Sequence, residues 1–424
     1  MTVAYPCLSK APTQADIHDA VCDALAGLAS PRADGKQWLS LTLPLPPLDL
    51  LSAFELIDAG EQGCYWENPH AREGLVAGGS VSQWTSAGGD RFGWGQQVAD
   101  AWLSQTLPLG VMAAPDVRIV CRFAFNDGLS SSSDLGGLSG LGAAASLTLP
   151  EWQVTRCQEV YRFTTNLSLD ALRSPAAVEA ACGQAWRQYK TLCQSARLPQ
   201  RASQLQSKSQ ALGLSLSAPD LPHLTRLPAV RERQRQFVAS AEALLHAIEQ
   251  GQLTKVVLAS AIDLVPQAPV STAMALRRLR RRYGGCHVFA VRSGKQTFLG
   301  ASPERLFRIR QLQLYTSAIA GSASRGATVM ADRRFAAALA RSDKERHEHR
   351  IVADFIFGRL QGLGLRPMGS PTPEILRLAN IQHLHTPITA ALPPQVHPLQ
   401  IVAALHPTPA MAGLPQKAAC EAIA

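Results

Sequence analysis

Two ionisable residues stand at points in the chain where a shifted pKa would be useful. Lys255 begins the apolar run KVVL, and a lysine held against an apolar strand can lose its charge and act as a general base. Glu304 follows a predicted strand and a proline in GASPERLF, where a positioned carboxyl could act as an acid. Taken singly, each residue also fits a plainer interpretation, a solvated strand end or a loop carboxylate.

A pair of carboxylates occurs in SDKERHEHRIV. Glu345 and Glu348 are three residues apart, which places both on one face of a helix, and His349 follows Glu345 by four. Mg²⁺ binds through one or two carboxylates and keeps waters that a substrate can replace. An exposed, salt-bridged helix would carry the same pattern, so the pair alone leaves both interpretations open.

The segment LHPTPAMAGLP, residues 405–415, contains His406, three prolines and a glycine. Prolines stiffen a loop, which suits a pre-formed pocket. The residues from Gln416 onward predict the first turns of a helix. The sequence contains no GxSxG, GxxxxGK[ST] or GxGxxG motif, so the common hydrolase, P-loop and dinucleotide signatures are absent.

The elements around these residues predict an α+β fold. In the first half, the segments WLSLTLPL, GCYWEN, VRIVCRFAF and EWQVTRCQEVYRFTTNLSL read as strands, and AVEAACGQAWRQYKTLCQSA reads as a helix. In the second half, an apolar stripe over residues 237–248 predicts a helix, followed by KVVLAS as a short buried strand. Two hairpins, CHVFAVR with TFLGAS and LFRIR with LYTSAI, precede one long helix expected from Asp332 to about Leu360.

Composition divides the chain into an N-terminal half, residues 1–225, and a catalytic half, residues 226–424. The first half contains a Gly/Ser-rich stretch at 126–146, predicted to be a flexible loop, and a connector at about 197–222. The 424 residues carry a net charge of +9, which is mild for this length. The basic run RRLRRRYGG fits a solvated helix end better than a nucleic-acid patch, so no nucleic-acid partner is expected.

Cysteine usage and the N-terminus bear on the compartment. The nine cysteines are scattered and form no CxxC pair, which argues against zinc or redox use and favours a reducing compartment. The first residues lack the basic and apolar regions of a signal peptide, and prolines interrupt the apolar stretch LTLPLPPLDLLSAF. We therefore expect a cytoplasmic protein without a membrane partner.

Six segments, taken in sequence order, resemble the chorismate-utilising enzymes. They are KVVLAS, FLGASPERLF, AIAGSASRG, SDKERHEHRIV, NIQHLHTPI and LHPTPAMAGLP, and the resemblance is strong from about Phe237 to Pro415. Within the family they look most like isochorismate synthases of the menaquinone or phylloquinone pathways. The resemblance implies the fold of anthranilate synthase component I, with large antiparallel sheets packed together, helices outside, and two interleaved halves.

The resemblance also implies a chemistry, the isomerisation of chorismate to isochorismate. Lys255 matches the family's base, which takes a proton from the water that attacks C2, and Glu304 matches the acid that protonates the departing C4 hydroxyl. Glu348, with Glu345 one turn away, matches the family's Mg²⁺ site, and Mg²⁺ would hold the ring carboxylate. The substrate site would be lined by Gly321, Ser322, His383 and Ala410.

Two substitutions, at Ser260 and Ser322, and a difference at the C-terminus depart from the family's pattern and affect these expectations. Ser260 stands where arginine is usual, and Ser322 replaces a threonine but keeps the hydroxyl. Ala410 stands where family members that add ammonia carry threonine, which favours water as the nucleophile.

The third departure is at the C-terminus. The resemblance implies that family members continue for about 60 residues beyond this end, a length consistent with one large domain. That stretch supplies an arginine for the substrate and a second glutamate for Mg²⁺. We therefore expect impaired turnover by this chain, or completion by a separate C-terminal fragment. Other outcomes left open are a salicylate synthase, an aminodeoxychorismate synthase, and a non-catalytic remnant or half of a split enzyme.

Overall fold

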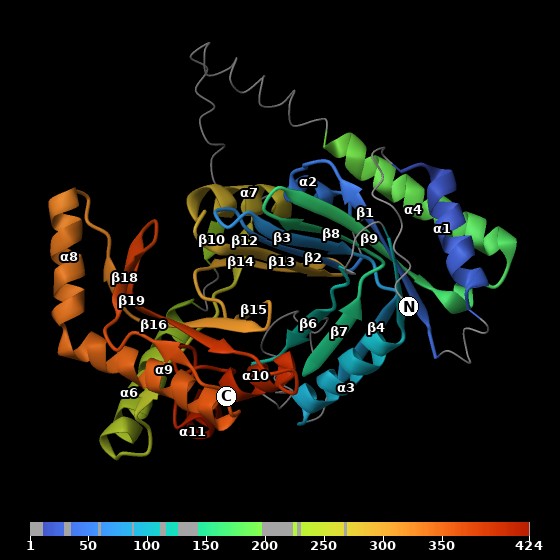
Figure 1. Ribbon diagram of the computed structural model, residues 1–424. Helices are drawn as coiled ribbons and strands as arrows, with labels where there is room; N and C mark the ends of the chain where they lie inside the picture. Colours follow the sequence, from blue (N-terminus) through green and yellow to red (C-terminus); the bar gives the residue numbers. More distant parts are fainter. Residues whose placement is uncertain are drawn as a thin grey trace, which may run out of the picture. The chain divides into compact units, whose positions relative to one another are not determined.

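The computed structural model of the chain describes residues 12–28, 35–57, 61–86, 89–110, 116–125, 143–196, 224–226, 230–266 and 269–423 (Figure 1). The chain divides into two compact units, and neither is continuous in sequence. The first unit comprises residues 1–124, 132–217 and 272–301, and the second comprises residues 125–131, 218–271 and 302–424. The predicted connector at 197–222 and residues 126–142 of the predicted loop lie outside the described residues.

The first unit is built on an eight-stranded sheet with the order β14-β13-β2-β3-β8-β9-β1-β5. In that order the strands are Gln296–Ser302, His287–Ser293, Gly63–Asn68, Glu73–Gly78, Trp152–Cys157, Val160–Ser168, Trp38–Leu45 and Thr106–Gly110. Strand β1 pairs antiparallel with β9 on one edge and parallel with β5 on the other. The four N-terminal segments expected to form strands therefore do so, three of them in this sheet and VRIVCRFAF as β6.

A three-stranded antiparallel sheet and five α-helices complete the described part of the first unit. The small sheet has the order β4-β7-β6, with strands Ser82–Ser86, Ala145–Leu149 and Val120–Phe123. The helices are α1 (Gln14–Ala26), α2 (Leu50–Glu55), α3 (Arg91–Ser104), α4 (Pro175–Ser195) and α7 (Thr272–Arg282). Strand β7 begins inside the predicted loop 126–146, so the prediction was wrong for its last residues, because Ala145 and Ser146 pair in register with β6.

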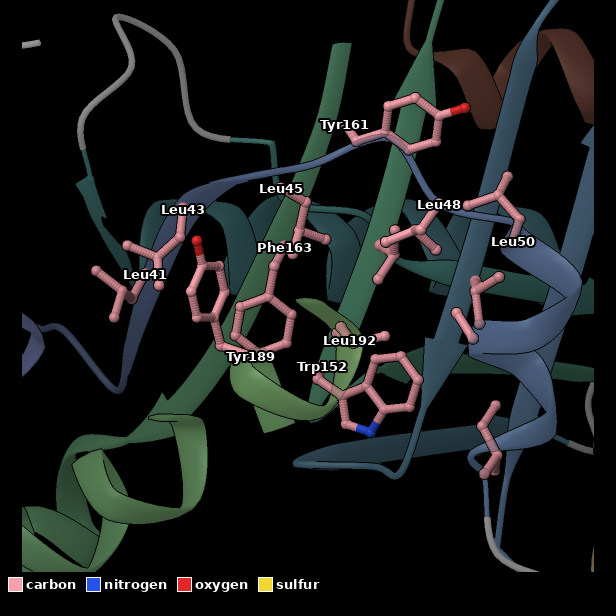
Figure 2. Packing of buried hydrophobic residues seen from close by; sticks show 14 of the residues in the cluster. Leu41, Leu43, Leu45, Leu48, Leu50, Trp152, Tyr161, Phe163, Tyr189 and Leu192 are labelled. Carbon is pink, nitrogen blue, oxygen red and sulfur yellow. The ribbon is translucent and has the colours of Figure 1, made fainter. Parts of the chain in front are cut away.

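The core of the first unit follows from the alternation of strand β1. Its residues Leu39, Leu41 and Leu43 are at most 3% exposed and pack with Phe163 and Tyr189, as Figure 2 shows for all but Leu39. The intervening polar side chains are buried as well and are hydrogen-bonded. For example, the hydroxyl of Ser40 donates to Asn166 on β9. The strand is therefore covered on both faces, and its polar groups are satisfied within the sheet.

The second unit contains a five-stranded sheet in the order β15-β16-β19-β17, with β18 also paired to β19. The strands are β15 (Arg308–Arg310), β16 (Gln313–Ser324), β17 (Met368–Gly369), β18 (Glu374–Arg377) and β19 (Ile381–Ala391). Two short pairs accompany it: β10 (Leu224–Arg226) with β12 (Leu264–Pro266), and β11 (Lys255–Val256) with β20 (Gly413–Leu414). The helices are α6 (Val230–Glu249), α8 (Val329–Arg341), α9 (Asp343–Gly362), α10 (Pro398–Leu405) and α11 (Gln416–Ile423).

Two predictions for the second unit were wrong. The long helix expected over residues 332–360 is two helices, α8 and α9, which part at Ser342. The backbone of Ser342 is extended, with φ −67° and ψ 117°, and its hydroxyl accepts a hydrogen bond from the amide of Glu345. Serine thus caps the N-terminus of α9, which is where this residue type is favoured over the interior of a helix.

The segment KVVLAS, expected to be a buried strand, forms only the two residues of β11. Lys255 and Val256 are half-buried, and Ala259 and Ser260 are exposed. Among the described strands β11 pairs with β20 alone, so one neighbour supports it instead of two. An apolar, β-branched run therefore predicted the strand but not its length or its burial.

Helix α9 carries the two carboxylates of the candidate metal site toward the sheet. Its buried residues His349, Val352 and Ile356 recur at spacings of three and four and face the core formed with β16 and β19. Glu345 and Glu348 lie one turn before His349 and Val352 on that same stripe. The face of α9 that packs on the sheet therefore also carries both carboxylates.

Candidate active site

Lys255 is held by a close antiparallel approach of two chain segments. The amide of Thr254 donates to the carbonyl of Leu414 at 2.8 Å, and the amide of Val257 donates to that of Ala412 at 2.7 Å. Gly413 lies between them with φ +147°, and a Cβ there would lie 2.1 Å from the carbonyl oxygen of Lys255. Only glycine allows this approach, so the LHPTPAMAGLP loop lies directly along β11.

The amine of Lys255 meets the same loop. Its Nζ donates a hydrogen bond of 2.7 Å to the carbonyl oxygen of Pro409, the residue before Ala410. Burial lowers the pKa of Lys255, while the negative charges of Glu348 and Glu304 act in the opposite direction without cancelling the shift. The predicted base thus lies in an environment that favours the neutral amine. It is next to Ala410, the residue expected to favour water over ammonia as the nucleophile.

Glu304 is fixed by a local turn. The hydroxyl of Ser302 donates to the carbonyl of Glu304 at 2.9 Å and accepts from the amide of the same residue at 3.2 Å. Burial raises the pKa of the Glu304 carboxyl, and the positive charge of Lys255 partly offsets that rise. Burial therefore favours the protonated acid at 304 and the neutral amine at 255, the protonation states that acid–base chemistry requires.

A bulge in β16 forms the next part of the site. The pairing of β16 with β19 shifts register between Ala320 and Ser322, and Gly321 adopts φ +79°. A Cβ on Gly321 would lie 3.1 Å from the carbonyl oxygen of Glu345, so a larger residue would press on α9. The amide of Ser322 donates to Oε2 of Glu345 at 2.9 Å.

His383 lies opposite Ser322 on β19. The Ser322 hydroxyl and Nδ1 of His383 are 2.9 Å apart and share a hydrogen bond. Burial lowers the pKa of His383, and a hydrogen bond to the backbone of Gly321 works against that shift. A neutral imidazole beside the bulge can donate or accept a hydrogen bond from a bound molecule without adding charge.

The structure brings the eight predicted site residues into two groups. Glu304 and Glu348 each lie close enough for their charges to act on Lys255, and Ala410 follows Pro409, the hydrogen-bond partner of Lys255. Gly321, Ser322, Glu345 and His383 are connected through the bulge of β16. Glu348 belongs to the first group and Glu345 to the second. Because the two residues are one turn apart on α9, that helix connects the groups.

Sequence reasoning missed three contributors to this arrangement. Pro409 gives its backbone carbonyl to Lys255, Gly413 admits the close approach of β11, and Thr386 bonds the buried ring of His349. A main-chain carbonyl leaves no signal in a sequence. The glycine in AGLP could have been found, since an isolated glycine beside a strand often marks a close backbone approach.

The carboxylate pair is the part of the site that could hold a metal. No cluster of three or more His, Cys, Asp or Glu side chains suited to a metal occurs within the described ranges. Two carboxylates nevertheless fit Mg²⁺, which commonly takes one or two and completes its shell with water and substrate oxygens. One oxygen of Glu345 already accepts the Ser322 amide, which orients the carboxylate.

Comparison with known proteins identifies the family. The model of the chorismate binding enzyme family matches residues 24–424, almost the whole chain. The chain belongs to the chorismate binding enzymes. The resemblance of the six segments is thereby confirmed, and so is the membership in a family of enzymes.

Two curated relatives show where this chorismate binding enzyme stands within the family. The salicylate biosynthesis isochorismate synthase of Pseudomonas aeruginosa is 38% identical over 195 residues, 46% of this chain and 41% of the relative. Isochorismate synthase MenF of Bacillus subtilis is 32% identical over 46% of this chain and 44% of its own length. The chain thus spans less than half the length of these curated relatives in the matched segments.

Solved structures extend the match along the chain. The menaquinone-specific isochorismate synthase MenF of Escherichia coli superposes with a TM-score of 0.65 and 25% identity, covering 96% of this chain and 82% of that one. Anthranilate synthase component I of Streptococcus pneumoniae, 17% identical with a TM-score of 0.53, shows the fold. The predicted α+β fold of the anthranilate synthase component I type is confirmed.

Proposed function

We propose that this chorismate binding enzyme converts chorismate to isochorismate by adding water at C2 and releasing the C4 hydroxyl. The observation that carries the proposal is the pair of opposite pKa shifts at Lys255 and Glu304, both caused by burial. A neutral amine can accept the proton of the attacking water. A protonated carboxyl can donate to the departing hydroxyl, so one proton enters the protein as another leaves it.

The size of these pKa shifts determines the fraction of molecules in which Glu304 is protonated and Lys255 is neutral at the same time. With ordinary pKa values of about 4.3 for glutamate and 10.4 for lysine, roughly one molecule in a million would hold a protonated acid and a neutral amine together. Each unit by which burial brings the two pKa values closer raises that fraction about tenfold. The hydrogen bond from Nζ to the Pro409 carbonyl also orients the amine, since it fixes one N–H direction.

Glu345 and Glu348 would hold Mg²⁺ in the active site. The ion would supply positive charge for the ring carboxylate of chorismate. Gly321 and Ser322 would line the substrate site beside the carboxylates, and His383 would offer an uncharged hydrogen-bonding group. Ala410 has no hydroxyl with which to hold ammonia, which supports water as the nucleophile.

For the pathway we propose only a class, and for the location a cellular compartment. The P. aeruginosa relative is named for salicylate biosynthesis and the E. coli structure for menaquinone, so the product would feed a quinone or an aryl-acid pathway. Phylloquinone biosynthesis is the quinone alternative. No helix in the described part of the chain has the length and apolar character needed to cross a bilayer. We propose a cytoplasmic enzyme that acts on a small molecule and binds neither membrane nor nucleic acid.

The test is product analysis with the purified 424-residue chain, chorismate and Mg²⁺. Isochorismate as the product supports the proposal, and it should disappear in Lys255→Met and Glu304→Gln but persist in Lys417→Ala, a control whose side chain is 90% exposed. Salicylate with pyruvate would identify a salicylate synthase instead. An amino product formed only with ammonia would identify an aminodeoxychorismate synthase.

The expected impairment of this chain, and its completion by a separate fragment, stay predictions that the same assay tests. Turnover far below that of E. coli MenF assayed in parallel would support impairment. Equal turnover would contradict it. No turnover, with chorismate bound but unchanged, would favour the non-catalytic alternative.

A further inference from the structure

His349 connects helix α9 to two paired strands of the sheet. Its side chain is buried, with the residue 4% exposed. Nδ1 lies 3.3 Å from the carbonyl oxygen of Ala320 on β16, and Nε2 lies 2.8 Å from the hydroxyl of Thr386 on β19. One ring therefore bonds three elements that must keep their relative positions if the site is to keep its shape.

The chemistry of the two partners fixes the proton on this ring. A carbonyl oxygen can only accept, so Nδ1 of His349 carries the hydrogen that bonds Ala320. In the neutral ring, Nε2 is then the acceptor for the hydroxyl of Thr386. Each of the two bonds thus has a single possible direction, so the ring has one orientation in which both form.

The helix is fastened to the bulge of β16 at two points. His349 bonds the carbonyl of Ala320, the residue before Gly321, and Glu345 bonds the amide of Ser322, the residue after it. The two side chains are four residues apart and therefore lie on one face, one turn from each other. Glu348 lies on the same turn, so its direction is set by the same pair of attachments.

We propose that His349 is a positioning residue that fixes the rotation and axial position of the first turns of α9 against the bulge. Through that contact it makes the carboxylates of Glu345 and Glu348 project together as one site. The part of this inference that concerns Mg²⁺ rests on the proposed function. The part that concerns the order of the bulge does not. His349 itself touches neither substrate nor metal in this account.

Three substitutions separate positioning from a general effect on packing. His349→Leu fills the space but removes both bonds. His349→Asn keeps a donor close to the position of Nδ1 and gives up the bond to Thr386. His347→Leu is the matched control, because His347 is an exposed histidine two residues away on the same helix.

Two measurements read the outcome. Titration calorimetry with Mg²⁺ alone should show affinity at least about tenfold weaker in His349→Leu, within about threefold of the parent in His349→Asn, and unchanged in His347→Leu. Hydrogen exchange at the Ser322 amide should accelerate in His349→Leu, because the bond to Glu345 loses its alignment. Equal losses in the leucine and asparagine variants, or no change in either measurement for His349→Leu, would overturn the proposal.

Failure of the proposed Mg²⁺ site and failure of the positioning role of His349 give different results. If the parent binds no Mg²⁺, the proposed metal site falls, while hydrogen exchange still tests the role of His349 in ordering the bulge. If His349→Leu does not fold, His349→Gln, whose longer amide matches the position of Nε2, keeps the bond to Thr386, gives up the bond to Ala320, and should still accelerate exchange at Ser322. Nitrogen NMR of the parent should show a protonated Nδ1, and the opposite tautomer would overturn the assignment.

Discussion

Charged side chains are withdrawn from solvent in both units, fully or in part, but they are held in different ways. In the first unit, the carboxylate of Glu67, 4% exposed, accepts from the hydroxyl of Tyr65 and pairs with Arg280 at 3.3 Å and Arg156 at 3.4 Å. Arg280 also pairs closely with Asp49. Opposite charges in direct contact offset the cost of burial, so this network holds α7, the α2 cap and the sheet together.

In the second unit, the half-buried charges of the candidate active site lie at a distance from one another. Lys255 donates to a neutral carbonyl, and the charges of Glu304 and Glu348 influence its pKa without a direct ion pair in the described structure. Burial therefore governs the protonation of Lys255 and Glu304, whereas direct ion pairs hold the Glu67 network together. The comparison teaches that charges withdrawn from solvent form a structural ion network when partners touch, and a reactive acid and base when they are held apart.

The largest effect should come from removing the reactive pair. Lys255→Met and Glu304→Gln should each lower kcat by about 10²- to 10⁴-fold, because each removes one proton-transfer partner. Neither should destabilise the protein at neutral pH, since each removes a group whose charged form burial disfavours. Kinetics and thermal denaturation of the same preparations check both statements, and a variant that retains normal kcat would exclude its residue from the chemistry.

The second-largest effect should come from the ion network around Glu67 in the first unit. Arg280→Met should lower the free energy of unfolding by about 3 kcal/mol, because it removes the ion pair of Asp49 and leaves the buried Glu67 with Arg156 as its remaining cation. Arg277→Met is the control on the same helix, since its ion pair with Glu55 is half-exposed and should contribute less than about 1 kcal/mol. Urea denaturation measures both, and equal losses would show that contact and burial make no difference here.

A smaller effect should appear in the pH dependence of stability. Because folding raises the pKa of Glu304, its contribution is fully present below the ordinary glutamate pKa and is lost as pH rises through the raised value. Lys255 has the opposite shift, so its contribution makes the fold more stable as pH rises from its lowered pKa toward the ordinary lysine value. Denaturation at a series of pH values should show that the parent loses stability relative to Glu304→Gln as pH rises above the ordinary glutamate pKa, and a constant difference between the two proteins would contradict the raised pKa.

The smallest effect should come from Ser322→Ala. This change removes the hydroxyl that bonds His383 but keeps the amide that bonds Glu345. We expect a loss of about 1 kcal/mol in unfolding free energy and little change in Mg²⁺ affinity. Calorimetry would contradict this if the alanine variant lost Mg²⁺ binding as His349→Leu is expected to do.

The sequence was sufficient for the fold class, for most strands and helices, and for the order of the six family segments. Hydrophobic periodicity predicted α4 and α6, and turn residues separated β13 from β14 and β15 from β16. Periodicity could not show that Ser342 divides α8 from α9, because a serine in a helical pattern is compatible with both a cap and an exposed interior position.

The candidate site was predictable in its residues but not in its interactions. Lys255 and Glu304 are 49 residues apart, and only the fold brings them into electrostatic contact. The environment that shifts their pKa values comes from burial and from main-chain groups such as the carbonyl of Pro409, neither of which has a residue-level signature. The bond between His349 and the bulge likewise depends on a register shift in β16 that no local pattern predicts.

Conversion of chorismate in water enriched with ¹⁸O tests the central claim most directly. If Lys255 activates water for attack at C2 while Glu304 assists departure of the C4 hydroxyl, the isochorismate formed will carry one ¹⁸O atom, at C2. Isochorismate without the label, or a labelled product formed equally fast by Lys255→Met, would contradict the account.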